Sequence, residues 1–490
     1  MLIIFLLAIV AAAASFAITE RRRDFALATS GAFLVLVVAY SILRFSSGYT
    51  GGYISVITYN LAESFGIVFS IGVSGFSDAL LILSAIVIFL SVLITEDGKY
   101  GPSLYSYILI TEVGLFGILI SRDFLFFYIF WEVVLIPVYF IVAQYGGANK
   151  DSISLKFFVY THIGSIFLLL SIFTVYTYHI EVSHLQPTFE MSQLMVPQYF
   201  ASIPAFWKYF AIFGFLLAFL VKMPSFPVHS WLPDTYEAAP YPGTVILAGG
   251  LSIMGGYGLF GILMPVYSDI GSGVLDLLMA LGIISLVYFS LAAMMQQNLK
   301  RMMAFASAGA MGFVTLSFGA GLVESGYSAT LELAGGMFQI FAHGLIMALI
   351  FSTLYYIHRN TGHEAIHSLG GIFREAPVLS SFLLAGLLAS LGLPGLAGFI
   401  GEFSILVGVF GAIGWLILVV IFAMIVTASY HIWAAQKSLY GPYNENLGKI
   451  RDAEWGTTAK LMGMLIVIFA LGVVPNLIYG ILVTYIGGIL

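Results

Sequence analysis

The sequence predicts an all-α polytopic membrane protein with about fourteen transmembrane helices. Only 9% of its 490 residues are charged, against about 25% in a typical soluble domain. Hydrophobic residues make up 60% of the chain, and the mean hydropathy is +1.03. A water-soluble globule cannot bury so much apolar surface, so this composition excludes soluble enzymes, nucleic-acid-binding proteins and disordered chains. The apolar stretches are continuous rather than alternating, which is typical of helices and not of outer-membrane strands.

The expected helices follow the apolar stretches in chain order. A helix needs roughly 20 apolar residues to cross the hydrocarbon core of a bilayer. The first stretch is expected to remain as a helix, because Arg21–Arg23 follow it, whereas the positive residues of a cleaved signal peptide precede the apolar run. The expected spans are about 1–18, 25–44, 77–95, 103–120, 124–143, 155–177, 207–223, 243–265, 274–294, 302–320, 328–357, 377–402, 408–435 and 458–487.

The Lys and Arg residues orient these helices. When the loops are assigned alternately to the two sides, one side receives 14 Lys and Arg residues, and the other receives only Arg44, Arg122 and Lys208. An excess of Lys and Arg in loops marks the cytoplasmic side of a membrane. The sequence therefore predicts that both termini face outward.

Two of the expected helices are interrupted. The seventh ends in Val221–Pro227, which contains two prolines, and the twelfth contains Leu391–Gly395. Proline removes a backbone donor and glycine weakens a helix, and at membrane depth the freed groups need protein or water beside them. Interrupted helices at corresponding places in two halves are typical of inverted-repeat transporters. The expected organisation is three N-terminal helices, two inverted five-helix repeats, and a cytoplasmic loop with the last helix, at residues 1–102, 103–265, 266–435 and 436–490.

Four ionisable residues inside the expected spans are candidates for function: Glu112, Glu132, Lys222 and Glu402. A charge at the centre of a bilayer costs about 2.5–3.5 kcal/mol on insertion scales, so each charge needs a partner or a function. One interpretation is a proton relay, in which moving one charge changes the proton affinity of the next group. The alternative is a fixed ion pair between Lys222 and Glu132 that holds two helices together. Two roles explain Glu112 equally well: a place in the relay, or an electrostatic influence on Glu132.

Three histidines extend this set. His343 lies inside the eleventh expected span, where an imidazole can hold or pass a proton near neutral pH; a structural hydrogen bond to a backbone carbonyl explains it equally well. His229 follows the broken seventh helix and is expected to line an aqueous mouth. His162 is the weaker candidate, because a lone histidine on an apolar helix is usually a satisfied core residue.

No metal or sulfur-bound redox centre is expected in this chain. Cysteine is absent, which excludes disulfides, thiolate metal sites and iron–sulfur clusters. Three histidines crowd one loop, at His358, His363 and His367. They have no Cys or pair of Asp residues beside them, so we expect a solvated loop and not a metal site. The histidines that carry no functional signal are His179, His184 and His431.

Several motifs resemble one family of membrane proteins. The most specific stretch runs from Val221-Lys222-Met223-Pro224 through His229 and Trp231-Leu232-Pro233-Asp234 to Ala239-Pro240 and Gly243. It is similar to the hallmark of the antiporter-like membrane subunits of respiratory complex I, and most similar to the M type, called chain 4 in mitochondria. Further matching segments lie between residues 70 and 455, and they include Phe130-Trp131-Glu132, Lys156-Phe157-Phe158, Leu299-Lys300-Arg301-Met302, Met311-Gly312-Phe313, His343-Gly344-Leu345, Leu393-Pro394-Gly395, Gly401-Glu402-Phe403 and Leu439-Tyr440-Gly441-Pro442.

The resemblance implies a subunit of a redox-driven proton pump in a prokaryotic plasma membrane. It implies fourteen helices in two inverted repeats, with a broken seventh and twelfth helix, which agrees with the count above. The chain would belong to an enzyme, an NAD(P)H- or other donor:quinone oxidoreductase, without redox chemistry of its own. No cofactor is expected in this chain; quinone, flavin and iron–sulfur clusters are expected in partner subunits. The expected partners are other membrane-arm subunits and the lipid bilayer, and no nucleic acid.

The resemblance also implies roles for individual residues. Glu132 and Lys222 would form the coupled pair of the entry half-channel. Glu402 would be the exit-side carboxylate, and Glu112 would match an additional carboxylate of the fourth helix.

A hydrated central axis with His229 and His343 is implied as well, and here the chain departs from the family. The family carries a second lysine in the eighth helix, four residues before the tyrosine of a Gly-Gly-Tyr-Gly-like segment, and Ile253 occupies that position here. In one interpretation, water chains through His343 and Ser252 bridge the apolar position. In the other, the subunit no longer conducts protons and serves as a structural or coupling element. The retained carboxylates and the retained lysine favour the first interpretation.

Other classes of function remain open on the sequence alone. A related ion-translocating hydrogenase or a multi-subunit Na⁺/H⁺ antiporter uses the same kind of subunit, and the accompanying proteins would distinguish them. A stand-alone secondary transporter would need its own substrate pocket and would be active as a purified monomer.

Overall fold

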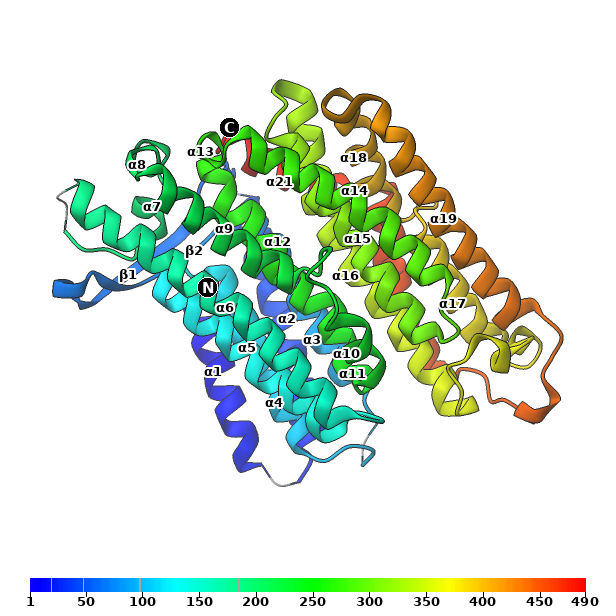
Figure 1. Cartoon of the computed structure of the whole chain (residues 1–490). Coiled ribbons are helices and arrows are strands. Elements are labelled where there is room, and N and C mark those ends of the chain that lie inside the picture. Colours follow the sequence, from blue (N-terminus) through cyan, green and yellow to red (C-terminus); the bar gives the residue numbers. More distant parts are fainter. Residues whose placement is uncertain (19, 47, 97, 184–185) are drawn as a thin grey trace.

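The computed structural model describes residues 1–18, 20–46, 48–96, 98–183 and 186–490, so His184 lies outside the described residues. The chain folds into one elongated body made almost entirely of helices (Figure 1). The helices of the first half are α1 (Leu2–Ala17), α2 (Arg22–Phe45), α3 (Gly75–Ile94), α4 (Ser103–Ile120), α5 (Phe124–Tyr145), α6 (Lys150–Ser183), α7 (Met191–Leu194), α8 (Pro197–Ser202), α9 (Ala205–Lys222), α10 (Leu232–Ala238) and α11 (Tyr241–Ile246). Those of the second half are α12 (Ser252–Tyr257), α13 (Tyr267–Ile270), α14 (Ser272–Met294), α15 (Leu299–Gly321), α16 (Gly326–Thr361), α17 (Pro377–Ser390), α18 (Ala397–Ile413), α19 (Ile417–Ala435), α20 (Trp455–Val473) and α21 (Asn476–Gly487).

Most of the long helices can cross a membrane. Twelve helical segments among the described residues are long and apolar enough, or thirteen if the bent unit of residues 366–374 and α17 counts as one span. The expected first span corresponds to α1, which has only 16 residues. The expected last span, 458–487, is divided at Pro475 into α20 and α21. A single last helix was therefore the wrong prediction, because proline interrupts the hydrogen bonds of a helix even where the apolar run continues.

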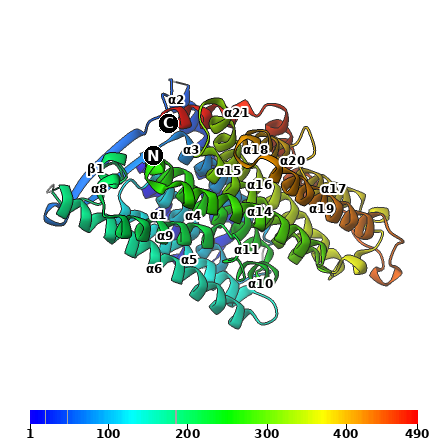
Figure 2. The ribbon, with the colours of Figure 1, turned by 45° about the horizontal axis from the view of Figure 1, so that its top comes forward.

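α16 occupies the centre of the body. It packs against α3, α15, α17, α18, α20 and α21. The apolar 18-residue stretch with which it could cross a membrane is buried throughout. In both views α4–α6 lie on one side of α16, and α17–α19 lie on the other (Figure 1 and Figure 2). Glycines permit this close packing: a Cβ at Gly336 would collide with Ser317, and a Cβ at Gly344 would come within 2.9 Å of Leu83. Small residues at helix contacts are the usual means of tight packing in membranes.

A small hairpin between α2 and α3 is the exception to the all-α prediction. Strands β1 (Ile54–Ala62) and β2 (Ile67–Val73) pair in antiparallel fashion. The second strand touches the turn between α4 and α5, where the Arg122 N–H donates a hydrogen bond to the Ser70 carbonyl at 2.9 Å. The same turn starts α5, because the Asp123 carboxylate accepts hydrogen bonds from two backbone N–H groups of the first helical turn. The fold class was predicted correctly for the membrane body, and the hairpin lies in a loop.

The break after α9 lies where the sequence predicted it. Met223–Ser230 are not helical, and the chain resumes a helix at α10. The groups freed by the break find protein partners: the Trp231 indole N–H donates to the Val221 carbonyl at 3.0 Å, and the Phe226 N–H donates to the Ser285 hydroxyl at 3.0 Å. At membrane depth this compensation is required, because lipid offers no hydrogen bonds.

The second break separates α17 from α18, and it corrects two expected boundaries. Gly392 and Gly395 in the break have φ of +77° and +91°, a backbone conformation that glycine adopts without steric cost. α18 then continues to Ile413, whereas the sequence placed the end of the twelfth span at 402 and the start of the thirteenth at 408. The turn lies at Gly414, which has φ of +52°. Apolar length could not locate it, because residues 403–435 contain no charge.

The expected eighth span is irregular. Its helix α11 passes into a π-helical turn at Leu247–Leu251, then into α12, and then into a second π-helical turn at Gly258–Leu263. The π-helical turns were not predicted. Such turns inside α-helices frequently occur at functional sites, and these two lie on either side of Ile253 in the chain.

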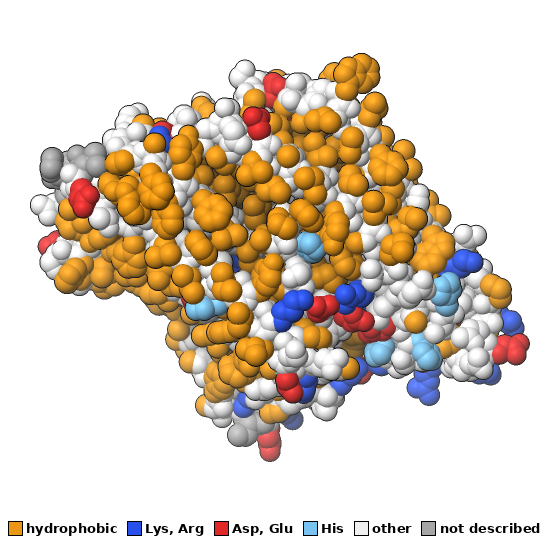
Figure 3. Space-filling model, viewed as in Figure 1, with side chains coloured by type: hydrophobic (Ala, Val, Ile, Leu, Met, Phe, Trp, Pro, Cys, Tyr) orange, Lys and Arg blue, Asp and Glu red, His pale blue; other side chains and the backbone are white. Residues whose placement is uncertain are grey.

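Charged side chains gather at one end of the body, which we call the basic end. Contacts there join loops that are far apart in sequence: Arg359 pairs with Glu96, and the Lys460 ammonium donates to the Leu93 carbonyl at 3.1 Å. The space-filling view shows Lys, Arg, Asp and Glu side chains gathered below a broad hydrophobic surface (Figure 3). The Lys- and Arg-rich loops of the sequence analysis therefore lie together, as a membrane orientation requires.

We predict that Trp231→Phe destabilises the protein, because the Val221 carbonyl would then lose its donor at the break. An unsatisfied buried acceptor costs about 1–3 kcal/mol. Thermal unfolding of the purified protein in detergent should therefore begin at a lower temperature in the variant. Trp207→Phe, at a side chain that is 41% exposed, is the matched control; equal shifts in both variants would contradict the proposed contribution of the indole N–H.

Candidate functional site

Buried ionisable side chains occupy the interior of the helical body. Glu112, Lys222, His343 and Glu402 are 1%, 1%, 3% and 7% exposed. Among the residues that the structure describes, the Lys222 ammonium and one oxygen of Glu112 have no hydrogen-bond partner. Buried polar groups are normally hydrogen-bonded, and a charge without a partner at this depth costs several kcal/mol, on the order of 3 or more. Such groups are therefore candidates for reversible protonation.

The entry side of the predicted relay comes from α5, α6 and α9. One oxygen of Glu132 lies 3.2 Å from Nδ1 of His162. Glu132 is also the carboxylate whose charge acts on Lys222, although the two are not hydrogen-bonded. The Lys222 ammonium lies 5.7 Å from the centre of the Trp131 ring, and a cation over an indole face is weakly stabilised. The structure therefore brings Glu132 and Lys222 into electrostatic range without the direct contact of a fixed ion pair.

His162 and His229 have different surroundings from those expected. His162 is not a satisfied core residue, because its side chain is partly exposed and pairs with Glu132; the helix face that carries it turns outward. His229 is buried against aromatic rings of α14, with the Phe289 ring centre at 4.7 Å and the Tyr288 ring centre at 5.1 Å. Its Nδ1 atom has no partner among the described residues.

The centre of the body contains a group of hydroxyls beside His343. The Ser307 hydroxyl on α15 lies 3.0 Å from Nε2 of His343 on α16. The buried Tyr236 hydroxyl on α10 lies within interaction range of the hydroxyls of Ser252 and Ser307, but it forms no hydrogen bond with a described residue. Ile253, at the position where the family has a lysine, is buried and contributes no polar atom. The Tyr236 hydroxyl therefore lies between Ser252 on α12 and Ser307 on α15.

The exit side comes from α16 and α18. Glu402 lies on α18, and a Cβ on Gly392 would come within 2.5 Å of one of its carboxylate oxygens. The side chain of Gln339 on α16 interacts with the same carboxylate, and it lies against Gly401, where a Cβ would collide with it. The glycines of the second break thus leave the space that Glu402 and Gln339 occupy.

Sequence analysis missed Tyr236, Ser307 and Glu332. Tyr236 and Ser307 carried no signal, because a hydroxyl in an apolar span is not expensive enough to require a function. Glu332 carried the same signal as Glu112, an ionisable residue inside an expected span, and could have been found by that rule. It is fully buried on α16, and both of its carboxylate oxygens lack partners among the described residues.

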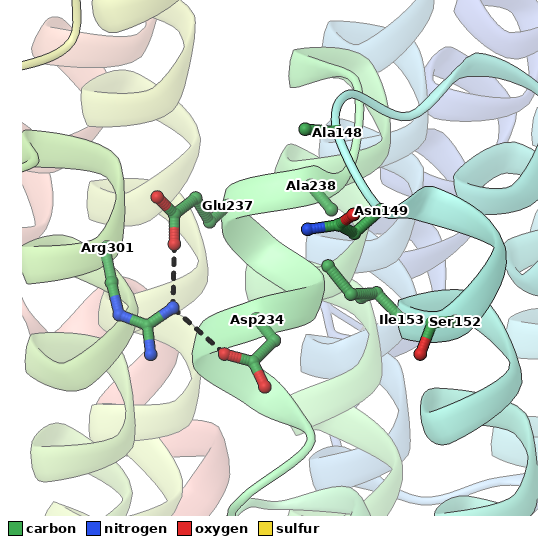
Figure 4. Close-up of a pocket in the computed structure, with 8 residues that line it drawn as sticks. All are labelled: Ala148, Asn149, Ser152, Ile153, Asp234, Glu237, Ala238 and Arg301. Atoms are coloured by element: carbon green, nitrogen blue, oxygen red, sulfur yellow. Dashed lines mark hydrogen bonds and ion pairs between the residues drawn. The ribbon is translucent and has the colours of Figure 1, made fainter.

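A cluster of charges surrounds α10 at the basic end. The Arg301 guanidinium on α15 lies 2.9 Å from an oxygen of Asp234 and 2.7 Å from an oxygen of Glu237 (Figure 4). Lys156 on α6 lies 2.7 Å from the other oxygen of Asp234, and the Lys300 ammonium donates to the Glu237 carbonyl at 3.2 Å. A cavity of about 560 Å³ opens between this cluster and residues 148–153. Its lining includes the charged side chains of Asp234, Glu237 and Arg301.

The histidine loop at the basic end has no metal-binding arrangement among the described residues, where no three His, Asp and Glu side chains converge. His358 lies 3.8 Å from a carboxylate oxygen of Glu364. The Glu364 carboxylate also accepts hydrogen bonds from the Tyr241 hydroxyl at 2.7 Å and the Asn298 amide at 3.1 Å. This loop therefore ties α11, α15 and α16 together.

Residues 121–427 match the family described as NADH:quinone oxidoreductase/Mrp antiporter, TM. The F(420)H(2) dehydrogenase subunit M of Methanosarcina mazei is 40% identical over 391 residues, which are 79% of this chain and 77% of the relative. The NADH-quinone oxidoreductase subunit M of Rickettsia felis is 30% identical over 440 residues, 89% of this chain and 86% of the relative.

Two solved structures share the fold. A chain of respiratory complex I from Thermus thermophilus with bound NADH superposes with a TM-score of 0.85 at 24% identity, covering 98% of both chains. A chain of the archaeal membrane-bound sulfane sulfur reductase superposes with a TM-score of 0.84 at 22% identity, covering 98% of this chain and 77% of that chain. These likenesses confirm the predicted fold class of a polytopic helical membrane protein.

We predict that the Asp234 cluster loses its stabilising effect in acid. Burial by itself raises the pKa of Asp234, but hydrogen bonds and charges from Lys156 and Arg301 outweigh burial and leave the pKa below its ordinary value. A carboxyl group whose pKa is lowered by folding adds stability above its unfolded pKa of about 4, and this contribution is lost as the pH falls through the lower folded value. The melting temperature of wild type should exceed that of Asp234→Asn at neutral pH; the difference should begin to shrink near pH 4 and should vanish only below the lowered folded pKa.

The control for this measurement is Asp151→Asn, at an exposed carboxylate of the same end. It should leave the melting temperature unchanged at every pH. A wild-type advantage over Asp234→Asn that stayed constant into acid would show that the cluster acts through packing and not through charge.

Proposed function

The chain belongs to the NADH:quinone oxidoreductase/Mrp antiporter family of transmembrane subunits, and on this premise we propose that it is the M-type proton-translocating subunit in the membrane arm of a complex I-like redox pump. Its partners are then further antiporter-like and small membrane-arm subunits. The named relatives belong to dehydrogenases with different electron donors, so a peripheral subunit determines the donor. This chain has no cysteine to hold an iron–sulfur cluster, and in this proposal iron–sulfur clusters, flavin and quinone all belong to partner subunits.

The observation that carries this proposal is Lys222. It is 1% exposed, makes no hydrogen bond to a described residue, and lies at the end of a helix that breaks immediately after it. A lysine whose function is to join helices would be in contact with its carboxylate, because breaking a buried pair costs about 3–5 kcal/mol. Lys222 instead interacts with Glu132 at a distance. A change of charge at Glu132 therefore changes the electrostatic stabilisation of the Lys222 ammonium.

The transport cycle follows from this coupling. Redox chemistry in the partner subunits changes the charge or position of Glu132, and the positive charge of Lys222 loses its compensation. Lys222 then releases its proton toward the centre, where the hydroxyls of Ser252, Tyr236 and Ser307 and the imidazole of His343 lead toward α16. Glu402 receives the proton on the exit side. The coupling free energy between the redox site and the relay is reciprocal, so movement of the proton also changes the energetics of the redox step.

The two helix breaks are suited to this cycle. Lys222 lies directly before the first break, and Glu402 lies six residues after the second. At a break, backbone N–H and C=O groups are free to bind water, whereas in a continuous helix they bond to one another. Broken helices at the bilayer midplane are also the usual position of ion sites in transporters with inverted repeats. We therefore assign the entry half-channel to the first break and the exit half-channel to the second. The basic end faces the cytoplasm in this proposal, and both termini face outward from the plasma membrane.

A second candidate function rests on Ile253. A relay that needs a central lysine would stop at this apolar side chain, and the chain would then serve as a structural or coupling subunit. The hydroxyls around Tyr236 favour conduction, because each can accept one proton and donate another once water completes the hydrogen bonds between them. The same fold in an Mrp complex from Dietzia (TM-score 0.81, 17% identity) leaves a place in a related ion-translocating hydrogenase or Na⁺/H⁺ antiporter as an alternative that purification of the native complex would test.

We predict that Glu402→Gln and Lys222→Ala sharply reduce proton pumping by the assembled complex. Each variant removes a group that must hold and release a proton, and losing such a group typically costs about 100-fold or more. Pumping is measured with a pH-sensitive dye in liposomes that contain the complex, and assembly is measured as co-purification of the partner subunits.

Lys208→Ala is the matched control for Lys222→Ala, since it removes a lysine from the other end of the same helix. It should pump normally. Normal pumping by both Glu402→Gln and Lys222→Ala would reject the relay in this chain.

Tyr236→Phe distinguishes conduction from the structural alternative. If hydroxyls replace the missing lysine, removing this hydroxyl should slow pumping by at least about tenfold, and the added substitution Ile253→Lys should restore part of the rate. Tyr356→Phe is the control, because its hydroxyl is also buried without a partner among the described residues but lies at the basic end. Unchanged pumping in Tyr236→Phe would favour the structural subunit.

A further inference from the structure

Glu332 is a buried carboxylate that the cycle above does not use. Its exposed fraction is 0%, and neither of its oxygens has a hydrogen-bond partner among the described residues. It takes part in none of the ion pairs found in the described part of the chain. An ionised carboxylate in this position would cost several kcal/mol, on the order of 3 or more. Among the described residues Glu332 thus joins no helices by an ion pair, and the position is suited to a group that gains and loses a proton.

The surroundings of Glu332 are built to hold it against α18. A Cβ at Gly408 would collide with the Glu332 side chain, and a Cβ at Gly321 on α15 would come within 3.3 Å of its Cβ. The Ser317 hydroxyl donates to the Glu332 backbone carbonyl at 2.7 Å, so this hydroxyl is occupied and does not neutralise the carboxylate. Glycines on two neighbouring helices thus provide the space, and no side chain that the structure describes hydrogen-bonds to the carboxylate there.

Toward the outer surface, the next acidic group is Glu324. It precedes α16 and is partly exposed, and its carboxylate lies against Gly411 of α18, where a Cβ would come within 2.6 Å of one oxygen. Glu324 is also the charged group that acts on Glu332 electrostatically. Two carboxylates in range of each other repel when both are ionised, and a proton on either of them relieves this repulsion.

Toward the centre, the next acidic group is Glu402, on the same α18. The three acidic groups follow α18 outward: Glu402 is part of the helix, Glu332 lies against Gly408, and Glu324 lies against Gly411. Six residues from 402 to 408 correspond to about 9 Å along the axis, and three more to about 4.5 Å. Both axial intervals are longer than a hydrogen bond, and Glu332 has no hydrogen-bond partner among the described residues, so water completes both steps in this route. Gln339 lies beside Gly401 at the inner end of this interval.

We propose that Glu332 is a proton carrier of the exit half-channel, receiving protons from Glu402 and passing them to Glu324 at the outer surface. In each step a carboxylic acid gives its proton to a carboxylate through water, and the donor becomes a carboxylate that accepts the next proton from the inner side. This inference rests on the proposed function, since it supplies the route by which a proton leaves Glu402.

The test compares Glu332→Gln with Glu332→Asp in the assembled complex, reconstituted into liposomes with a pH-sensitive dye. The amide keeps the size of the side chain and cannot carry a proton, whereas the aspartate keeps the carboxyl. Glu332→Gln should slow pumping by at least about tenfold, and Glu332→Asp should keep a rate within about threefold of wild type. Asp276→Asn, at an exposed carboxylate in the first residues of α14, should pump normally.

The outcomes separate this inference from the proposed function. If Glu402→Gln fails to pump while Glu332→Gln pumps normally, the exit role of Glu332 is wrong and the relay stands. If Glu402→Gln itself pumps normally, the proposed function fails. Equal losses in the Gln and Asp variants, or loss of partner subunits from the Gln variant, would show that Glu332 is structural and would overturn the inference. Recovery of pumping in Glu332→Ala on addition of formate, a small acid that can take the place of the carboxyl, would support it.

Discussion

The cost of holding an ammonium group in an apolar interior constrains the rest of this structure. Lys222 lies at the depth of the apolar spans without a hydrogen bond to a described residue, and its compensation comes from the face of Trp131 and the more distant charge of Glu132. A tightly paired lysine would be stable and inert. Compensation at a distance leaves the ammonium sensitive to small changes at Glu132, and that sensitivity is what a coupled transport step requires.

The backbone satisfies a second constraint, because lipid cannot replace a missing hydrogen bond. The first break meets it with side-chain partners, and at the second break the Leu393 N–H donates to the Leu388 carbonyl at 3.0 Å. The Trp231 indole and the Ser285 hydroxyl take up groups freed at the first break, and Gly392 makes room for the Glu402 carboxylate at the second. Each break thus places an ionisable side chain beside irregular backbone. The π-helical turns around Ile253 add a third irregular region between them.

The two ends of the body differ in their chemistry. At the basic end, Lys156, Lys300 and Arg301 surround the carboxylates of α10 beside an open cavity. Between α16 and α18, toward the opposite end, the ionisable groups are carboxylates, namely Glu402, Glu332 and Glu324. A route that begins among mixed charges and ends among acids is asymmetric. In the proposed cycle this asymmetry gives the entry and exit half-channels different electrostatic environments, although the helices assigned to them are similarly broken.

The sequence by itself determined the membrane class and most helix positions through apolar length, the two breaks through Pro and Gly, and the clustering at one end through the Lys and Arg of the loops. It could do so because hydrocarbon constrains every segment of the chain separately. Only the tertiary structure decided which polar groups meet. It paired Glu132 with His162, placed Tyr236 between Ser252 and Ser307, and set Glu332 against Gly408. A helix that is apolar on all sides carries no periodic signal of its rotation or depth. The contacts among its few polar groups therefore depend on packing between helices, which the sequence of one helix does not specify.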